Sequence, residues 1–216
     1  MTVYLTVDDA PSADLPEKLD LLADREVPAL FFCEGRRLAD HPEHARRAVE
    51  AGFHLGNHAY SHTSAADLSV AAFRDEVERT ESLIRDAYDR AGATRPAKLF
   101  RFPYGEKGGE DADAFQRVLA DRRFVPPDPD RLGDRYADRH AGDRDWYWTV
   151  DLRDWEVDSP DELRDRVDSA AERLDGESST IVLFHDAGNS TELFEAFLDA
   201  LDDQGVDFGD PLDLLD

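Results

Sequence analysis

Carboxylate, imidazole and guanidinium side chains recur in this chain directly after short apolar segments. These positions are Asp8 and Asp9 after Val3–Val7, His58 and His62 after Phe53–Gly56, Arg101 near the end of Lys98–Phe102, Asp151 and Asp154 after Trp146–Val150, and His185 after Thr180–Phe184. In a parallel β/α barrel, the carboxyl ends of the strands open onto one face, where active sites are built. We therefore expect these polar groups to gather in one catalytic site.

His58 and His62 have a spacing that suits a divalent metal ion. On a helical turn, residues four apart share a face, so both imidazoles could reach the same ion. The alternative interpretation of this pair is the polar start of a helix. The carboxylates of Asp8 and Asp9 could supply a third ligand, or could instead cap the following helix through an Asx-turn. Two imidazoles and one carboxylate would leave positions open for water and substrate, as a catalytic metal site requires.

The segments that must position these groups alternate between two patterns. The strand-like runs are Val3–Val7, Ala29–Cys33, Phe53–Gly56, Lys98–Phe102, Arg123–Val125, Trp146–Val150, Thr180–Phe184 and Val206–Phe208. Helix-like stretches lie near residues 15–25, 42–51, 66–91, 111–121, 160–174 and 191–203. Repeated strand-then-helix units predict an α/β fold with a parallel sheet inside, closed or nearly closed as a barrel. A length of 216 residues suits a single domain over the whole chain, 1–216.

One stretch, Pro126–Arg144, breaks this alternation. It has three prolines near its start, many charges and no apolar periodicity. We interpret it as a long loop over the rim of the barrel that restricts which substrates enter. The alternative is a solvated, mobile loop that touches nothing.

The chain is strongly acidic. Fifty Asp and Glu residues stand against twenty-five Lys and Arg residues, which gives a formal net charge of −25. A field of this sign repels nucleic acid and anionic membranes, so neither is expected as a partner. Only three of the basic residues are lysines. We interpret this composition as that of a halophilic protein that works in concentrated salt, with an ordinary acidic protein as the alternative.

The cysteine count, the apolar runs and the N-terminus exclude or disfavour further classes of protein. Cys33 is the only cysteine, which excludes an intramolecular disulfide and a cysteine-based zinc site. No apolar run approaches the length of about 18 residues that a membrane span needs. The N-terminus has no basic region, apolar region or cleavage site of a secretory signal, which favours a cytoplasmic location over secretion. The sequence does not indicate an oligomeric state.

Five motifs resemble, in order, those of the polysaccharide deacetylase family, which is the NodB-homology group or carbohydrate esterase family 4. The motifs are Thr6–Pro11 (TVDDAP), Gly56–His62 (GNHAYSH), Arg101–Gly105 (RFPYG), Asp151–Trp155 (DLRDW) and Leu183–His185 (LFH). They span nearly the whole chain. The resemblance implies a distorted (β/α) barrel with seven or eight strands.

The resemblance also implies a role for each motif residue. The divalent metal ion, usually Zn²⁺, would be bound by Asp9, His58 and His62. Asp8 would be the general base, oriented by Arg101, and His185 would be the general acid, paired with Asp154. The backbone N–H of Tyr104 would hold the oxyanion and contact the substrate. Trp155 and Leu183 would form the apolar wall around the acetyl methyl group.

The function implied is a metal-dependent hydrolase that removes acetyl groups from N-acetylated amino sugars or other acetylated carbohydrates. An alternative enzyme on the same fold is a deacylase, deformylase or amidohydrolase of a small-molecule substrate. A third, non-enzymatic alternative is a sugar-binding module with a degenerate site. That last alternative predicts a missing base or acid, yet Asp8 and His185 are both present.

Overall fold

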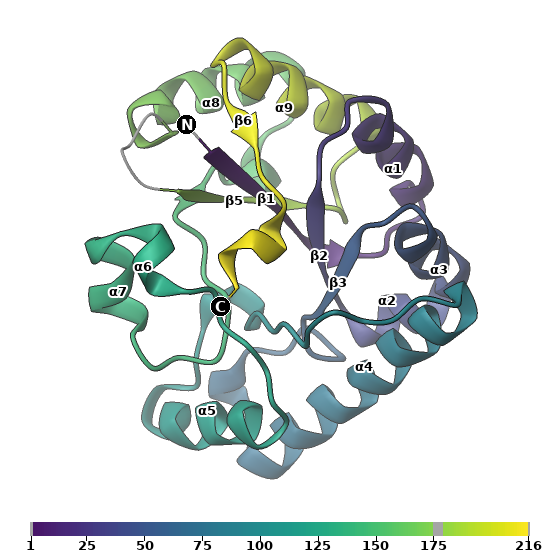
Figure 1. The fold of residues 1–216 in the computed structure, drawn as a ribbon, viewed down its shortest axis with the longest axis vertical. Coiled ribbons are helices and arrows are strands. Elements are labelled where there is room, and N and C mark those ends of the chain that lie inside the picture. Colours follow the sequence, from purple (N-terminus) through teal and green to yellow (C-terminus); the bar gives the residue numbers. More distant parts are fainter. Residues whose placement is uncertain (1, 175–178, 216) are drawn as a thin grey trace.

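The strands of this protein form one parallel sheet with helices around it (Figure 1). The computed structural model describes residues 2–174 and 179–215. The strands are β1 (Thr2–Ala10), β2 (Ala29–Cys33), β3 (His54–Asn57), β4 (Val150–Asp151), β5 (Thr180–His185) and β6 (Asp207–Phe208). The longer connections are helical, because each strand must return to the same end of the sheet to pair in parallel. This arrangement confirms the predicted α/β class.

At least one helix follows each of the strands β1 to β5. The helices are α1 (Leu15–Asp24), α2 (Gly35–Asp40), α3 (Pro42–Glu50), α4 (Val70–Ala91), α5 (Ala112–Asp121), α6 (Pro129–Leu132), α7 (Asp134–His140), α8 (Pro160–Leu174) and α9 (Thr191–Asp203). Short 3₁₀ turns lie at Ala65–Asp67, Pro103–Gly105, Gly109–Asp111, Asp154–Glu156 and Pro211–Leu214. Figure 1 shows the helices arranged around the central strands.

The strand order is β3-β2-β1-β5-β4, and β6 also pairs with β1. The long strand β1 is therefore central, with Val7 opposite Phe31 of β2 on one side and opposite Phe184 of β5 on the other. All these ladders are parallel, so the ends of β1, β3 and β5 that carry Asp8, His58 and His185 lie at the same edge.

The two faces of the sheet pack into different clusters. Val3, Leu5 and Val7 belong to the main cluster, together with α9 residues such as Phe194 and Phe197. The intervening Tyr4 belongs to a second cluster that includes Leu30, Phe32, Trp146 and Ile181. Alternation along β1 follows from the two-residue period of a strand. It leaves Thr6 and Asp8 on the same face as Tyr4.

The predicted number of seven or eight strands is wrong for the described part of the chain, which has six. Lys98–Phe102 forms only an isolated bridge, between Phe100 and Asn57, and Arg123–Val125 forms no strand. Backbone hydrogen bonds still join these segments to each other and to their surroundings, from Val125 N to the Lys98 carbonyl at 2.9 Å and from Trp146 N to the Phe100 carbonyl at 2.7 Å. Pro96 and Pro103 lie on either side of the first segment and Pro126 follows the second, and proline cannot donate to a ladder. Within the described residues, the regular ladder stays open between β4 and β3.

The stretch Pro126–Arg144 is more ordered than predicted. It forms α6 and α7, which bury Leu132 and Tyr136 in the cluster around Trp146. The interpretation as a loop is therefore wrong, because each of these two short helices buries one apolar side chain among the many charged residues.

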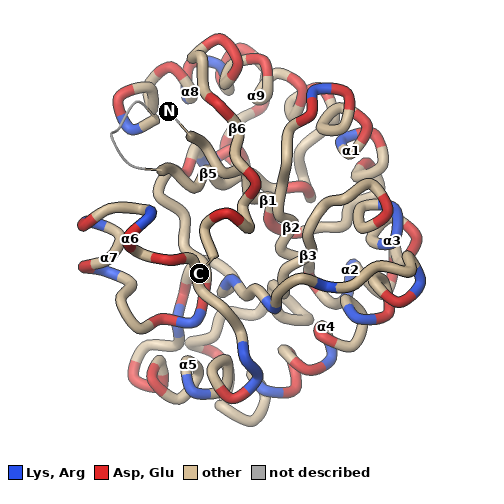
Figure 2. The backbone as a smooth tube through the Cα atoms, in the orientation of Figure 1, with Lys and Arg blue, Asp and Glu red and all other residues tan. Residues whose placement is uncertain are grey.

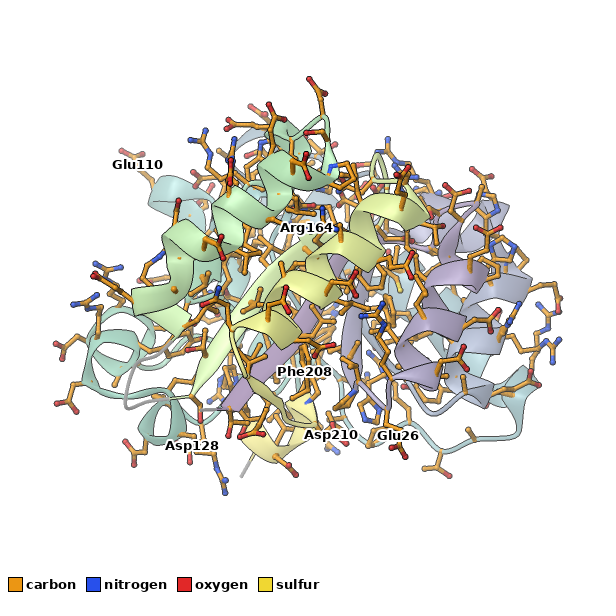
Figure 3. All side chains as sticks on the ribbon, turned by 90° about the horizontal axis from the view of Figure 1, so that it is seen from above. Glu26, Glu110, Asp128, Arg164, Phe208 and Asp210 are labelled. Atoms are coloured by element: carbon orange, nitrogen blue, oxygen red, sulfur yellow. The ribbon has the colours of Figure 1, made fainter. Side chains whose placement is uncertain are left out.

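Acidic residues lie on all the outer helices rather than in one tail (Figure 2). Side chains such as Glu110 and Asp128 project away from the body of the molecule (Figure 3). Among the described helices, none is long and apolar enough to cross a membrane.

Candidate functional site

A bulge in β1 brings two neighbouring carboxylates to the same site. In a regular strand Asp8 and Asp9 would point to opposite faces. Here three steps of β1, from Val7 to Ala10, are paired with two steps of β2, and Asp9 has φ of 60°. The extra residue and the left-handed conformation turn the Asp9 side chain toward that of Asp8. Such backbone conformations are costly for a residue other than glycine and tend to be kept at functional sites.

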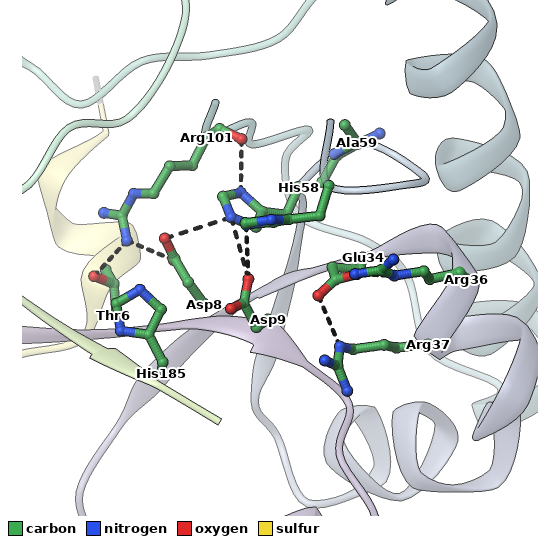
Figure 4. Close-up of polar contacts among 12 residues, drawn as sticks. Thr6, Asp8, Asp9, Glu34, Arg36, Arg37, His58, Ala59, Arg101 and His185 are labelled. Carbon is green, nitrogen blue, oxygen red and sulfur yellow. Dashed lines mark hydrogen bonds and ion pairs between the residues drawn. The ribbon is translucent and has the colours of Figure 1, made fainter. Parts of the chain in front are cut away.

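Asp9, His58 and His62 form the only group in the described residues whose His, Cys, Asp or Glu atoms could hold a metal ion together. Their candidate ligand atoms all lie within 4.8 Å of one another. Asp9 Oδ1 lies 3.5 Å from His58 Nε2 and 3.1 Å from His62 Nε2. Figure 4 shows the carboxylates and the His58 ring pointing toward one another.

The two histidines converge through an irregular turn. The predicted helical turn between them is wrong, because residues 58–62 form no helix and Ala59 and His62 both have positive φ. Glu76 of α4 holds the turn, because its Oε2 accepts hydrogen bonds from the backbone N–H groups of Tyr60 and Ser61. The ring centroids of His58 and His62 are 5.1 Å apart.

The charge states of Asp9 and His58 suit a cation. His58 Nδ1 lies 2.8 Å from the Arg101 carbonyl, so it carries the proton and leaves the Nε2 lone pair facing Asp9. Burial lowers the pKa of His58, which keeps the imidazole neutral. Burial tends to lower the pKa of His62 as well, but its contact with Asp9 raises it overall. Burial alone would raise the pKa of Asp9, yet its contact with His62 and the charges of both histidines hold it far below its usual range.

Asp8 is held by Arg101. The Arg101 guanidinium is fully buried, and its Nη1 donates to Asp8 Oδ1 at 2.8 Å and to the Thr6 hydroxyl at 2.8 Å. The second oxygen, Asp8 Oδ2, lies 3.7 Å from His58 Nε2. One oxygen of Asp8 is thus fixed by a charge-assisted hydrogen bond, while the other faces His58 of the Asp9–His58–His62 group.

His185 is held by Asp154. His185 Nδ1 lies 2.9 Å from Asp154 Oδ1, and the backbone N–H of His185 donates to Asp154 Oδ2 at 2.9 Å. Burial tends to lower the pKa of His185, but the hydrogen bond and charge of Asp154 outweigh it and raise the pKa to about 9. The ring is therefore a protonated acid near neutral pH.

These side chains line a pocket of about 400 Å³. Its lining residues are Asp8, Asp9, His58, His62, Tyr104, Trp148, Asp151, Trp155, Leu183, His185 and Ala187. Tyr104 and Trp155 are the exposed large aromatic side chains of the described residues, at 68% and 53%, and their rings contact His62 and His185 respectively. Leu183 also lines the pocket, and its side chain is buried.

Several residues at the site escaped the sequence analysis. Trp148 lines the pocket, but the sequence indicated only a strand there, whereas Asp151, which also lines the pocket, was among the expected polar groups. Asn189 donates to Asp154 Oδ2 at 2.6 Å, and a lone asparagine in a loop gives no signal of such a contact. The predicted rim stretch Pro126–Arg144 does not line this pocket. Its residues line a neighbouring pocket that shares Trp148 with it.

Comparison with known sequences decides the family. The polysaccharide deacetylase sequence model matches residues 1–118, more than half of the chain. The chain belongs to the polysaccharide deacetylase family. Its relatives include chitooligosaccharide deacetylases. That of Sinorhizobium fredii is 31% identical over 193 residues, which cover 89% of this chain and 75% of the relative. That of Rhizobium leguminosarum bv. trifolii is 28% identical over 203 residues, 94% of this chain and 79% of the relative.

Solved structures of family members have the same fold. A family 4 carbohydrate esterase from Streptomyces lividans, in complex with acetate, superposes with a TM-score of 0.71 at 27% identity, over 96% of this chain and 91% of that one. A family 4 pseudoenzyme from Bacillus anthracis superposes with a TM-score of 0.74 at 28% identity, over 100% of this chain and 65% of that one. The family thus includes proteins described as enzymes and as pseudoenzymes, so the residues of the site decide which description fits this chain.

Proposed function

We propose that this protein is a metal-dependent carbohydrate deacetylase that hydrolyses the N-acetyl groups of amino sugars. The observation that carries the proposal is one pocket lined by Asp9, His58 and His62 together with Asp8 and His185. Buried Arg101 and Asp154 hydrogen-bond to Asp8 and His185 respectively. Relatives described as chitooligosaccharide deacetylases support the substrate class. The finer assignment of a metal and of each residue's role is part of this proposal.

The residues present fit a divalent cation. Asp9 Oδ1 is buried and accepts no hydrogen bond from the described residues, although two imidazole nitrogens lie within 3.5 Å. A buried acceptor without a donor is costly, and a cation between these three groups would satisfy it. Two imidazoles and a carboxylate are a ligand set that Zn²⁺ accepts in catalytic sites. When bound, such an ion would polarise the acetamide carbonyl and make water a stronger acid.

Asp8 is proposed as the general base. Its Oδ1 is fixed by Arg101, so its Oδ2 remains directed toward the proposed metal ligands, where it can accept a proton from the attacking water. Arg101 has no route to solvent and keeps Asp8 in one orientation. The carboxylate then works without rotating during the reaction.

His185 is proposed as the general acid. It would deliver a proton from Nε2 to the leaving nitrogen when the carbon–nitrogen bond breaks, while Asp154 holds Nδ1 and steadies the positive ring. The backbone N–H of Tyr104 would hold the negative oxygen that develops on the acyl carbon. Trp155 and Leu183, on the His185 side of the pocket, would contact the acetyl methyl group.

We expect the basic limb of the pH profile to report His185. The imidazole must be protonated to act, so activity is present below its pKa and lost as the pH rises through it. Asp154→Asn removes the charge that raises this pKa, so we expect the basic limb of kcat/KM to move to lower pH. A bound cation also lowers the His185 pKa, so the test is the shift between variants. Asp151→Asn, which removes a pocket carboxylate without a hydrogen bond to His185, should shift the limb less. Equal shifts in the two variants would contradict the assignment.

An acetate-release assay tests the proposed function. The protein would be offered chitooligosaccharides, acetylated xylan and small N-acyl sugars, in concentrated salt and with added divalent metal. We expect release from the chitooligosaccharides. Activity confined to the small substrates would favour the alternative of a small-molecule amidohydrolase. Binding of sugars without any release would favour the sugar-binding alternative.

We also propose that the protein works in concentrated salt. Acidic residues cover its outer helices, and a net charge of −25 destabilises the compact state through self-repulsion. Potassium chloride shortens the Debye length from about 10 Å at 0.1 M to about 3 Å at 1 M. We expect the melting temperature to rise over this range, and chloride is used because sulfate stabilises proteins by exclusion from their surface. A melting temperature that does not change would contradict the halophilic interpretation.

A further inference from the structure

A buried ion pair lies beside the candidate site and includes none of the residues assigned above. The Lys18 side chain of α1 is 1% exposed, and its ammonium donates three hydrogen bonds. The acceptors are the Asp186 carbonyl at 2.6 Å, Asp186 Oδ1 at 2.8 Å and the Asn189 carbonyl at 2.8 Å. Desolvation offsets the attraction within such a pair, so its presence is weak evidence for stability alone. All three N–H groups instead hold one segment, the loop that follows His185.

The same ion pair connects this loop to the end of β1. Asp186 Oδ2 accepts from the backbone N–H of Ser12 at 2.6 Å, and Asp186 Oδ1 accepts from the Ser12 hydroxyl at 2.8 Å. The backbone N–H of Asp186 donates to the Asp8 carbonyl at 2.8 Å. The segment that carries the proposed base and the segment that carries the proposed acid are therefore fixed to each other.

Asn189 carries the connection to the catalytic pair. Its Nδ2 donates to Asp154 Oδ2 at 2.6 Å and to the His185 carbonyl at 3.0 Å. Asp154 Oδ2 also accepts from the His185 backbone, which leaves Oδ1 for the His185 ring. Two donors on one oxygen restrict rotation of the carboxylate, so the other oxygen keeps its direction toward the imidazole.

We propose that Asn189, held in place by the Lys18–Asp186 pair, is a positioning residue for the general acid His185. The inference rests on the proposed deacetylase function. Asn189 lies outside the pocket lining and acts through Asp154. In the step concerned, the acyl carbon–nitrogen bond breaks, the leaving nitrogen takes the electron pair and a proton from His185, and Asp154 remains ionised. Asn189 serves this step by keeping the ring in the orientation from which that proton is transferred.

The test uses Asn189→Ala and two substrates that differ in their need for an acid. Removal of an amine requires its protonation, whereas the phenolate of 4-nitrophenyl acetate leaves without a proton. We expect kcat for chitooligosaccharide deacetylation to fall by about 10-fold or more, the scale of loss known for removing a hydrogen-bond partner of a metal ligand. KM, metal content and activity on the aryl ester should stay near their wild-type values. If the wild type does not cleave the ester, the test is the kcat of Asn189→Ala on chitooligosaccharides. A loss of kcat with unchanged KM and metal content would then support the positioning role.

Ser190→Ala is the matched control. It removes the cap of α9 one residue away, where the Ser190 hydroxyl accepts from Leu193 N, and it touches neither Asp154 nor His185. We expect its kcat to stay near that of the wild type. Lys18→Met should reproduce the loss seen in Asn189→Ala, and if it does not fold, Asn189→Ala alone decides.

The possible failures are distinguishable. A wild-type protein that releases no acetate overturns the proposed function. An active wild type with an unchanged kcat in Asn189→Ala overturns the positioning role. Equal losses on amide and ester, or equal losses in Asn189→Ala and Ser190→Ala, would also overturn it, because they indicate a general loosening of the loop.

Discussion

Asp8→Asn is expected to lower acetate release by a factor of roughly 10²–10⁴, the usual contribution of a general base, while the metal stays bound. The amide is nearly the same shape as the carboxylate, and its oxygen can still accept the hydrogen bond from Arg101. It can no longer take a proton from water. The measurement is kcat on chitooligosaccharides together with the metal content of the purified variant.

Asp9→Asn is the matched control for this prediction. The two aspartates are neighbours in β1, yet Asp9 Oδ1 faces both histidines while Asp8 Oδ1 faces Arg101. We expect Asp9→Asn to lower metal affinity, and added metal to restore part of its activity. Added metal should not restore Asp8→Asn. If both variants lose the metal to the same degree, the division of roles between the two carboxylates is wrong.

His58→Ala combined with His62→Ala is expected to abolish both metal binding and hydrolysis. Each histidine contributes one of three proposed ligand atoms, and a lone carboxylate cannot hold the ion in this geometry. The fold should survive, because His62 lies in an irregular turn outside the hydrophobic clusters and the core of β3 is Leu55. Elemental analysis and a cooperative thermal transition check the two parts of this expectation.

A second histidine pair supplies the control. His41 and His44 stack with ring centroids 5.0 Å apart, close to the 5.1 Å of His58 and His62, but they are not part of a metal-binding group among the described residues. His41→Ala with His44→Ala should leave metal content and activity near those of the wild type. Metal retained at the wild-type level in the His58–His62 double variant would refute the ligand assignment.

Much of the fold follows from local patterns in the sequence. The buried strands β1, β2 and β5 lie at the predicted apolar runs. Helix α8 spans the predicted residues 160–174, and at its start Glu162 N donates to the Ser159 hydroxyl. Polar residues directly after these strands indicated the edge where the site lies, because parallel strands all end there. The position of the pocket could therefore be predicted from local sequence patterns, without knowledge of contacts between segments.

Other features depend on contacts that no local pattern contains. The apolar run Lys98–Phe102 has the composition of a strand, but only Phe100 bridges to a neighbour, since pairing depends on what lies beside it. The bulge that turns Asp9 toward Asp8 depends on the register between β1 and β2. Lys18 and Asn189 are separated from Asp186 and Asp154 by 168 and 35 residues. Their roles become visible only when the loop after β5 is placed against α1.

The measurement that tests the central claim most directly is a metal titration of the wild-type protein. The protein would be treated with a chelator in concentrated salt and freed of it. Zn²⁺ would then be added stepwise while acetate release from chitooligosaccharides is followed. We predict that the chelated protein releases almost no acetate and that activity rises in proportion to added metal up to a single ion per chain. Full acetate release by the chelated protein, with no bound metal detected by elemental analysis, would contradict the account.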